Sequence, residues 1–284
     1  MKRLIINADD YGLCDSVNRG ILECLRSGAV SDLSFMVNLT EFREAVHLLK
    51  CDRIDKIGFH LNFTVGESIL GIQSNLTDKN GRYLSLKNLA YKIFSGKISY
   101  NNIYEEIKAQ INLLVDHGFK ITHIDSHQNI HLLTAIMEPL MRINSELDLK
   151  VHIRMPYEKM HNIFKLKFSN LARIAILNLM TLYCSCRTNY RYCIETIGGN
   201  IFNNPHPDAV FKKVIKIIDN GPHSTYEMPV HVGYPSEKLQ GYDWYSNQRR
   251  VELEFFERNI LTNVNMIKIV SFNKIFLETT NILG

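Results

Sequence analysis

Short apolar runs alternate with helical patterns along this chain, and this alternation limits the folds that it can adopt. The apolar runs predict strands over residues 3–8, 31–37, 56–61, 120–124, 150–154, 225–231 and 266–271. Apolar residues at helical spacing predict helices over residues 16–27, 41–49, 86–94, 103–117, 132–145, 160–184, 208–218 and 248–261. Strands separated by helices are typical of parallel sheets with right-handed crossovers.

We therefore expect an α/β fold, an irregular (β/α) barrel similar to a TIM barrel with about seven parallel strands. Single barrels of this class commonly reach roughly 250 residues, so we expect one domain over residues 1–284. Residues 64–86 are polar and include the turn signal Asn80-Gly81. This segment is interpreted as an excursion over one face of the domain rather than a linker.

The composition excludes several classes of protein. With 45% hydrophobic and 22% charged residues, the chain can bury a full core and is not typical of disordered proteins or disulfide scaffolds. Its net charge of +4 is too small to indicate nucleic-acid or membrane-surface partners. No apolar run is long enough for a secretory signal or a membrane span. The six cysteines form no C-x-x-C pair, so we expect a cytoplasmic protein with mostly buried thiols.

Polar residues gather at the carboxyl ends of the predicted strands, where parallel α/β folds hold their catalytic groups. They are Asp9 and Asp10, His60 and Asn62, Asp125, Ser126 and His127, Arg154, and Glu227 and His231. Carboxylates and imidazoles bind divalent metal ions and also act as general bases and acids. The pattern predicts a site on one rim of the barrel.

Each group also has a plainer interpretation. Adjacent carboxylates on an extended segment point to opposite sides, so that one of Asp9 and Asp10 can bind a metal while the other acts as a base. Asp10 or Asp15 could equally cap the helix that begins near residue 16. His60 could be a hydrogen-bonded core histidine, and His231 could be structural rather than a proton donor.

The densest polar cluster is His123-Ile124-Asp125-Ser126-His127-Gln128-Asn129-Ile130-His131. Such a cluster allows one metal ligand together with a group that orients it. On a helix, His127 and His131 would share a face, but no glutamate follows His127, so the zincin motif H-E-x-x-H is absent. The alternative is a solvated loop, although three of the eleven histidines of the chain fall in this short segment.

Four separated motifs occur in a recognisable order. They are Asn7-Ala8-Asp9-Asp10-Tyr11-Gly12, Gly58-x-His60-Leu61-Asn62, His123-x-Asp125-Ser126-His127-x-x-x-His131, and His231-x-Gly233-Tyr234, with Arg154-x-Pro156 before the last. The combination resembles the YdjC-type carbohydrate deacetylases over nearly the whole chain. Members of that family look like irregular α/β barrels that bind one divalent metal ion and remove acetyl groups from sugars such as chitooligosaccharides.

The resemblance implies a role for each matching residue. The metal ligands of the family fall on Asp10, His60 and His127, its catalytic base falls on Asp9, and its late histidine, the acid, falls on His231. The chain departs from the family pattern in two places, because Asn129 stands where a histidine is frequent and Val232 where proline is usual. Neither departure removes a ligand position, so activity is expected.

The chemistry of amide hydrolysis agrees with these roles, since it needs an activated water, a stabilised oxyanion and a protonated amine leaving group. Mixed nitrogen and oxygen ligands suit zinc, magnesium or manganese, and we expect Mg²⁺ or Zn²⁺. Asp9 would take a proton from the water, His231 would give one to the sugar nitrogen, and Arg154 would orient Asp9 or the substrate. The residues expected to contact the substrate are Tyr11, Asn62, Asp125, His131 and Trp244.

The sequence thus favours a metal-dependent hydrolase that removes an acetyl group from an N-acetylated sugar, a short chitin-derived or related oligosaccharide. Two alternatives stay open, because a fold alone does not determine the chemistry. One is another metal-dependent sugar hydrolase or isomerase on the same barrel, and the other is a carbohydrate-binding protein without turnover. The resemblance also implies a homodimer.

Overall fold

The computed structural model describes residues 1–72, 75–157, 168–188, 194–197, 207–239, 246–258 and 267–275. These residues fall into two compact units. Unit 1 contains residues 1–9, 16–33 and those from 154 onward, and unit 2 contains residues 10–15 and 34–153. The boundary between the units crosses the first strand between Asp9 and Asp10.

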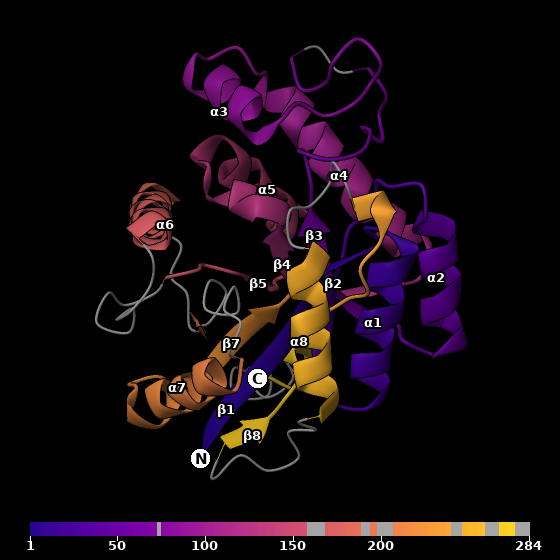
Figure 1. Ribbon diagram of the computed structural model, residues 1–284. Helices are drawn as coiled ribbons and strands as arrows, with labels where there is room; N and C mark the ends of the chain where they lie inside the picture. The colour runs from indigo at the N-terminus through magenta and orange to yellow at the C-terminus, as the bar shows by residue number, and fades with distance from the viewer. Residues whose placement is uncertain are drawn as a thin grey trace. The chain divides into compact units, whose positions relative to one another are not determined.

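Unit 1 contains parallel strands whose order does not follow the sequence. Strand β1 (Lys2–Tyr11) pairs with β7 (Thr225–Val230), and β7 pairs in turn with β6 (Glu195–Thr196). A late strand, β8 (Ile267–Ile269), also pairs with β1. Figure 1 shows the indigo β1 running beside the orange β7, so that segments from the two ends of the chain are neighbours in this unit.

Helices of unit 1 bury apolar faces. Helix α1 buries Val17, Ile21 and Cys24 on one face, and the chain leaves it at Gly28, whose φ of 76° suits glycine. The helices of this unit are α1 (Asp15–Arg26), α6 (Phe168–Thr188), α7 (Pro207–Asn220) and α8 (Ser246–Arg258).

Unit 2 contains parallel strands in the order β5-β4-β3-β2. The register places Ser34 beside Gly58 and His60 beside Asp125. The strands are β2 (Asp32–Phe35), β3 (Lys56–Leu61), β4 (Lys120–Ser126) and β5 (His152–Ile153). The helices are α2 (Phe42–Cys51), α3 (Leu86–Phe94), α4 (Tyr100–Asp116), the short 3-10 helix η1 (His127–Leu132) and α5 (Thr134–Glu146).

Strands β1, β3 and β4 are buried along most of their length. Ile5, Ile6 and Phe59 in these strands have no exposed surface, as expected for parallel strands that are covered on both faces. The polar residues at the carboxyl ends of these strands are buried with them. Each such group therefore needs a hydrogen-bond partner, an opposite charge or a bound ion.

The predicted fold class, an α/β fold of the irregular (β/α)-barrel type built on parallel strands, is confirmed. Several elements differ from the prediction, β1 and β6 among them. Strand β1 continues to Tyr11, whose carbonyl accepts a hydrogen bond from the Met36 amide at 2.7 Å, so Asp9 and Asp10 lie within the strand rather than after it. Strand β6 was not predicted, because an element of two residues carries no readable periodicity.

Residues 64–86 hold two isolated antiparallel bridges in their described part, Glu67–Arg82 and Thr77–Tyr83. The expectation of a single domain stays a prediction. Within the described ranges, none of the helices combines the length and the apolar character that a membrane span requires.

Candidate functional site

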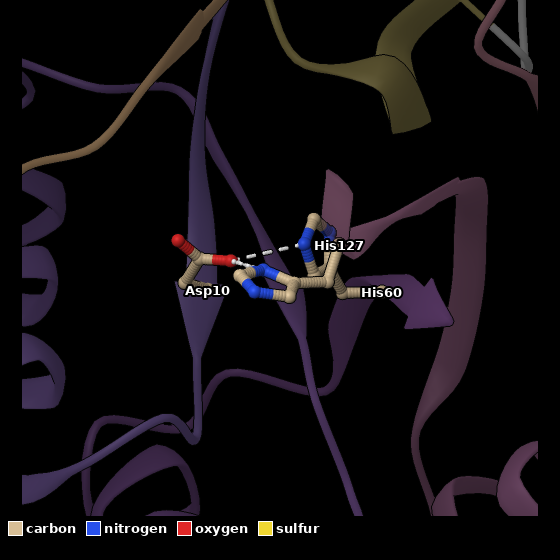
Figure 2. Close-up of side chains that lie close together, drawn as sticks. All are labelled: Asp10, His60 and His127. Carbon is tan, nitrogen blue, oxygen red and sulfur yellow. Dashed lines mark hydrogen bonds and ion pairs between the residues drawn. The ribbon is translucent and has the colours of Figure 1, made fainter. Parts of the chain in front are cut away.

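A carboxylate and two imidazoles meet in unit 2. Oδ1 of Asp10 lies 3.1 Å from Nε2 of His60 and 2.9 Å from Nδ1 of His127. Figure 2 shows both rings directed at the same carboxylate oxygen. All three residues are buried, with exposed fractions of 2% for Asp10, 2% for His60 and 8% for His127. The structure thus brings together the three residues that the sequence predicts as metal ligands.

Left-handed backbone conformations help to place Asp10. Its φ is 69°, in a region that aspartate enters more readily than most residues, and the φ of Gly12 is 93°. A Cβ atom at Gly12 would lie 2.2 Å from the carbonyl oxygen of Met36. Only glycine therefore fits at this turn, which carries the chain away immediately after the carboxylate.

The chain also turns sharply after His127. Gln128 and Asn129 have φ values of 55° and 54° inside η1, so residues 127–131 do not form a regular helix. His127 faces Asp10, whereas His131 pairs through Nδ1 with the hydroxyl of Ser126. These contacts give His127 and His131 separate surroundings.

The donor set fits a divalent cation. Two ligands that bind one ion at about 2.1 Å and at a right angle are about 3 Å apart, which is the spacing between Asp10 and each imidazole. Nε2 of His127 is buried and has no hydrogen-bond partner among the residues that the structure describes. A buried polar nitrogen without a hydrogen-bond partner costs free energy. A further ligand bound at Nε2 of His127 would remove that cost.

Neighbouring carboxylates determine the protonation state of His60. Burial lowers the pKa of His60, but the carboxylates of Asp125 and Asp10 outweigh burial and raise the pKa to about 10. Without a cation the ring is therefore protonated at neutral pH. A cation that binds to this ring takes the place of a proton, so binding releases a proton.

In unit 1, Arg154 joins two buried carboxylates. Nη1 and Nη2 donate to the two oxygens of Asp9 at 2.7 and 2.8 Å, and Nε donates to Oε1 of Glu227 at 2.7 Å. Asn7 donates a further hydrogen bond to Oδ1 of Asp9 at 2.8 Å. This two-point contact fixes the orientation of both oxygens of Asp9, as expected if Arg154 orients the predicted base.

His231 follows β7 and is half-buried. Its backbone N–H donates to Oε2 of Glu252 at 2.7 Å, and Glu252 lies on α8, where it is 1% exposed. Burial raises the pKa of Glu252, while the charges of His231 and Arg249 act in the opposite direction. The predicted acid therefore has a buried carboxyl group as a neighbour.

Two of the predicted substrate contacts lie in the interior. Tyr11 is fully buried, its hydroxyl donates to the carbonyl of Ala45 at 2.9 Å, and its ring meets Phe35 edge-on. Asn62 is also fully buried, and its Nδ2 donates to the carbonyl of Val65 at 2.7 Å. These contacts favour packing and loop-holding roles for both side chains.

Of the other three predicted substrate contacts, the structure describes Asp125 and His131. Asp125 and His131 are fully buried, and Asp125 accepts hydrogen bonds from His60 and Ser34 at 2.7 Å each. Trp244 lies outside the described residues. The roles of these residues toward a substrate stay predictions.

Sequence reasoning missed two buried polar residues, Ser34 beside Asp125 in unit 2 and Glu252 beside His231 in unit 1. Ser34 lies in a predicted strand that also contains Ser31 and Asp32, and nothing in the sequence distinguishes it from them. Glu252 lies three residues after Arg249 in a predicted helix, so both could have been placed on one face. From the sequence, Arg249 and Glu252 would be interpreted as a solvent-exposed ion pair, whereas both are 1% exposed in the structure.

Comparisons with known proteins agree with the geometry. The sequence profile of the family described as YdjC-like protein matches residues 3–264. A carbohydrate deacetylase of Brevibacillus brevis is 28% identical over 99% of this chain and 100% of its own length. A chitooligosaccharide deacetylase of Yersinia enterocolitica is 35% identical over 54% of this chain and 59% of its own length.

A solved structure from Enterococcus faecalis V583, provisionally described as a cellobiose-phosphate cleavage protein, has a similar fold. The TM-score is 0.69 with 20% sequence identity, over 96% of this chain and 98% of that one. At this identity the likeness supports the fold and says nothing about the substrate.

Proposed function

This chain belongs to the YdjC-like protein family, and we propose on that premise that it is a metal-dependent hydrolase that removes an acetyl group from an N-acetylated sugar. The names of its relatives favour a short chitin-derived or related oligosaccharide as the substrate. The observation that carries the proposal is the convergence of Asp10, His60 and His127 on one point in a buried setting.

Asp10, His60 and His127 would hold one divalent cation, Mg²⁺ or Zn²⁺. When bound, such a cation polarises the acetyl carbonyl and lowers the pKa of a water molecule. The remaining steps fall to side chains of the chain itself.

Asp9 acts as the general base in this proposal. It is the sequence neighbour of Asp10, and consecutive Cα atoms are about 3.8 Å apart, so it cannot be remote from a cation held by Asp10. Arg154 holds both oxygens of Asp9 in place. The carboxylate takes a proton from the water as the water attacks the acetyl carbon.

His231 acts as the general acid. It donates a proton to the sugar nitrogen while the carbon–nitrogen bond breaks, so that the amine leaves in neutral form. The neighbouring Glu252 fixes the backbone at His231 through the hydrogen bond to its N–H. Acetate and a free amino sugar are the products.

We extend the proposal to the organisation of the protein. Residues 1–284 form one deacetylase domain with an excursion at 64–86. A cytoplasmic location is also part of the proposal. The family resemblance favours a homodimer, and neither nucleic acid nor membrane is proposed as a partner.

The decisive experiment combines metal analysis with acetate release from N-acetylglucosamine oligomers of different length. Loaded with Mg²⁺ or Zn²⁺, the wild-type protein is expected to release acetate. Asp9→Asn should lower the rate by roughly 10²–10⁴-fold, the usual contribution of a general base, and still bind metal. His60→Ala and His127→Ala should lose the metal.

Matched controls are Asp148→Asn and His47→Ala, since both residues are exposed, and both variants should behave as wild type. Release of another product from a sugar would favour a different hydrolase or isomerase. Sugar binding by metal-loaded protein without any product would leave only the binding-protein alternative.

A further inference from the structure

A buried chain of hydrogen bonds runs behind His60 across three strands of unit 2. Thr122 Oγ1 lies 2.9 Å from Nδ1 of His123, and Nε2 of His123 lies 3.0 Å from Oγ of Ser34. Ser34 donates to Oδ2 of Asp125 at 2.7 Å, and Oδ1 of Asp125 lies 2.7 Å from Nδ1 of His60. Thr122 is 8% exposed, and the other four are at most 2% exposed.

The carboxylate of Asp125 determines the direction of the neighbouring bonds. A carboxylate only accepts, so Nδ1 of His60 and the hydroxyl of Ser34 both donate to Asp125. The Ser34 hydroxyl hydrogen is then engaged, and its oxygen accepts from Nε2–H of His123. With His123 neutral, its Nδ1 accepts from the hydroxyl of Thr122.

We propose that Asp125 and the Ser34–His123 pair behind it are positioning residues that hold His60 with Nδ1–H inward and present Nε2 to the cation. This inference rests on the proposed metal site and deepens it. Nε2 of His60 is the nitrogen that lies 3.1 Å from Oδ1 of Asp10. A carboxylate behind a ligating imidazole fixes both the tautomer and the angle of the ring. Asp125 thereby acts on His60 rather than on the sugar.

The absence of a side chain at Gly58 leaves room for the contact between Ser34 and His123. Gly58 lies beside Ser34 in the β2–β3 register and beside His123 in the β3–β4 register. A Cβ atom at Gly58 would lie 2.3 Å from Nε2 of His123 and 2.8 Å from Oγ of Ser34. A side chain there would displace the His123 ring and break its contact with Ser34.

The test measures Zn²⁺ affinity by competition with a chromophoric chelator in Asp125→Ala, Asp125→Asn and Ser34→Ala. Loss of the carboxylate should weaken Zn²⁺ binding by roughly 10–100-fold. Asp125→Asn keeps an oxygen that can accept from Nδ1–H and should recover part of that loss. Ser34→Ala should weaken binding less than Asp125→Ala, because the carboxylate and its contact with His60 remain and only the contact with Ser34 is lost.

A second readout follows the imidazole itself. Nitrogen-15 NMR of the Zn²⁺-loaded wild-type protein should show His60 only as the Nδ1–H tautomer with Nε2 bound. In Asp125→Ala the same spectrum should show a change at the His60 nitrogens. A merely structural role for Asp125 would leave these signals in place.

The chain offers a matched control in the same unit, where the buried Ser68 donates to the buried Glu106 at 2.6 Å. Ser68→Ala and Glu106→Gln remove the same kind of contact elsewhere and should leave Zn²⁺ affinity unchanged. Thermal unfolding of each metal-free variant shows whether it is folded. If Asp125→Ala does not fold, the comparison of Ser34→Ala with Ser68→Ala decides.

Wild-type Zn²⁺ affinity in a folded Asp125→Ala would overturn the inference. If that variant instead raised KM alone, Asp125 would be the substrate contact expected from the sequence. Equal loss of Zn²⁺ affinity in Ser34→Ala and Ser68→Ala would also overturn the inference. Loss of a buried hydrogen bond anywhere in the unit would then explain both results. Failure of the proposed deacetylation is a separate result, visible as absent acetate release from wild-type protein that binds Zn²⁺.

Discussion

Arg154 divides its guanidinium between two buried carboxylates, Asp9 and Glu227. Arg154→Ala leaves both without their cation and should lower the free energy of unfolding by about 3–5 kcal/mol. Arg154→Lys keeps the charge but loses the two-point contact, so it should keep more stability than Arg154→Ala while losing acetate release. Urea unfolding and acetate release measure the two effects.

A surface arginine provides the comparison. Arg142 pairs with Glu146 at 2.6 Å, but its side chain is 57% exposed. Arg142→Ala should leave the stability close to that of the wild type, because solvent screens an exposed ion pair. Similar losses of stability in Arg142→Ala and Arg154→Ala would show that the buried ion pairs of Arg154 stabilise the protein no more than an exposed one.

Site residues were predictable where a side chain that can bind metal follows a predicted strand. Asp10, His60 and His127 each stand at the end of a strand pattern, and parallel strands bring such ends together. Ser34 could not be recognised, because its role depends on the register of β2 against β3. Tyr11 is an expected sugar contact by sequence and is fully buried in the structure, because an aromatic residue in a sequence does not reveal its burial.

At the level of elements, Glu106 on α4 anchors the segment at 64–86. It accepts from the hydroxyl of Ser68 at 2.6 Å, the amide of Ile69 at 2.8 Å, and the hydroxyl of Tyr83. Burial and the Glu106 charge raise the pKa of Tyr83 well above its usual value. Tyr83 therefore stays a neutral donor.

Glu106→Ala should leave several buried donors unsatisfied and lower the stability by about 3 kcal/mol. The segment at 64–86 should also become cleavable by protease under native conditions, at a rate that limited proteolysis measures. The neighbouring Glu105 is exposed, and Glu105→Ala should retain wild-type resistance. Equal resistance in the two variants would show that Glu106 is not the anchor.

Elements with a clear repeating pattern were predicted with their bounds, and elements without one were not. The ranges 56–61 and 86–94 coincide with β3 and α3, because the alternation or the helical spacing of apolar residues is clear in each. Strand β6 and the left-handed turn in η1 depend on single contacts and single backbone angles. Neither leaves a repeating signal in the sequence.

For the whole molecule, Asp32 makes stability depend on pH. Burial raises its pKa to about 7, although hydrogen bonds from Ser31 and the Phe272 amide act to lower it. The native protein then keeps this proton between about pH 4 and pH 7, where the unfolded chain has lost it. The contribution of Asp32 to stability is thus full below about pH 4 and is lost as the pH rises through 7.

Asp32→Asn imitates the protonated side chain and should remove this dependence. The variant should match the wild type near pH 4 and be the more stable of the two at pH 8, as measured by urea unfolding of the metal-free proteins. Asp148→Asn, at an exposed position, should follow the wild type throughout. A difference between Asp32→Asn and wild type that does not vary with pH would contradict the assignment.

The space at Gly58 also restricts how this sequence can vary over time. A side chain at position 58 would force the imidazole at position 123 out of its present place, because the added Cβ would lie 2.3 Å from the ring. Substitutions at the two positions are therefore not independent of each other. A change from glycine at position 58 is expected to be tolerated better when the residue at position 123 is smaller than histidine.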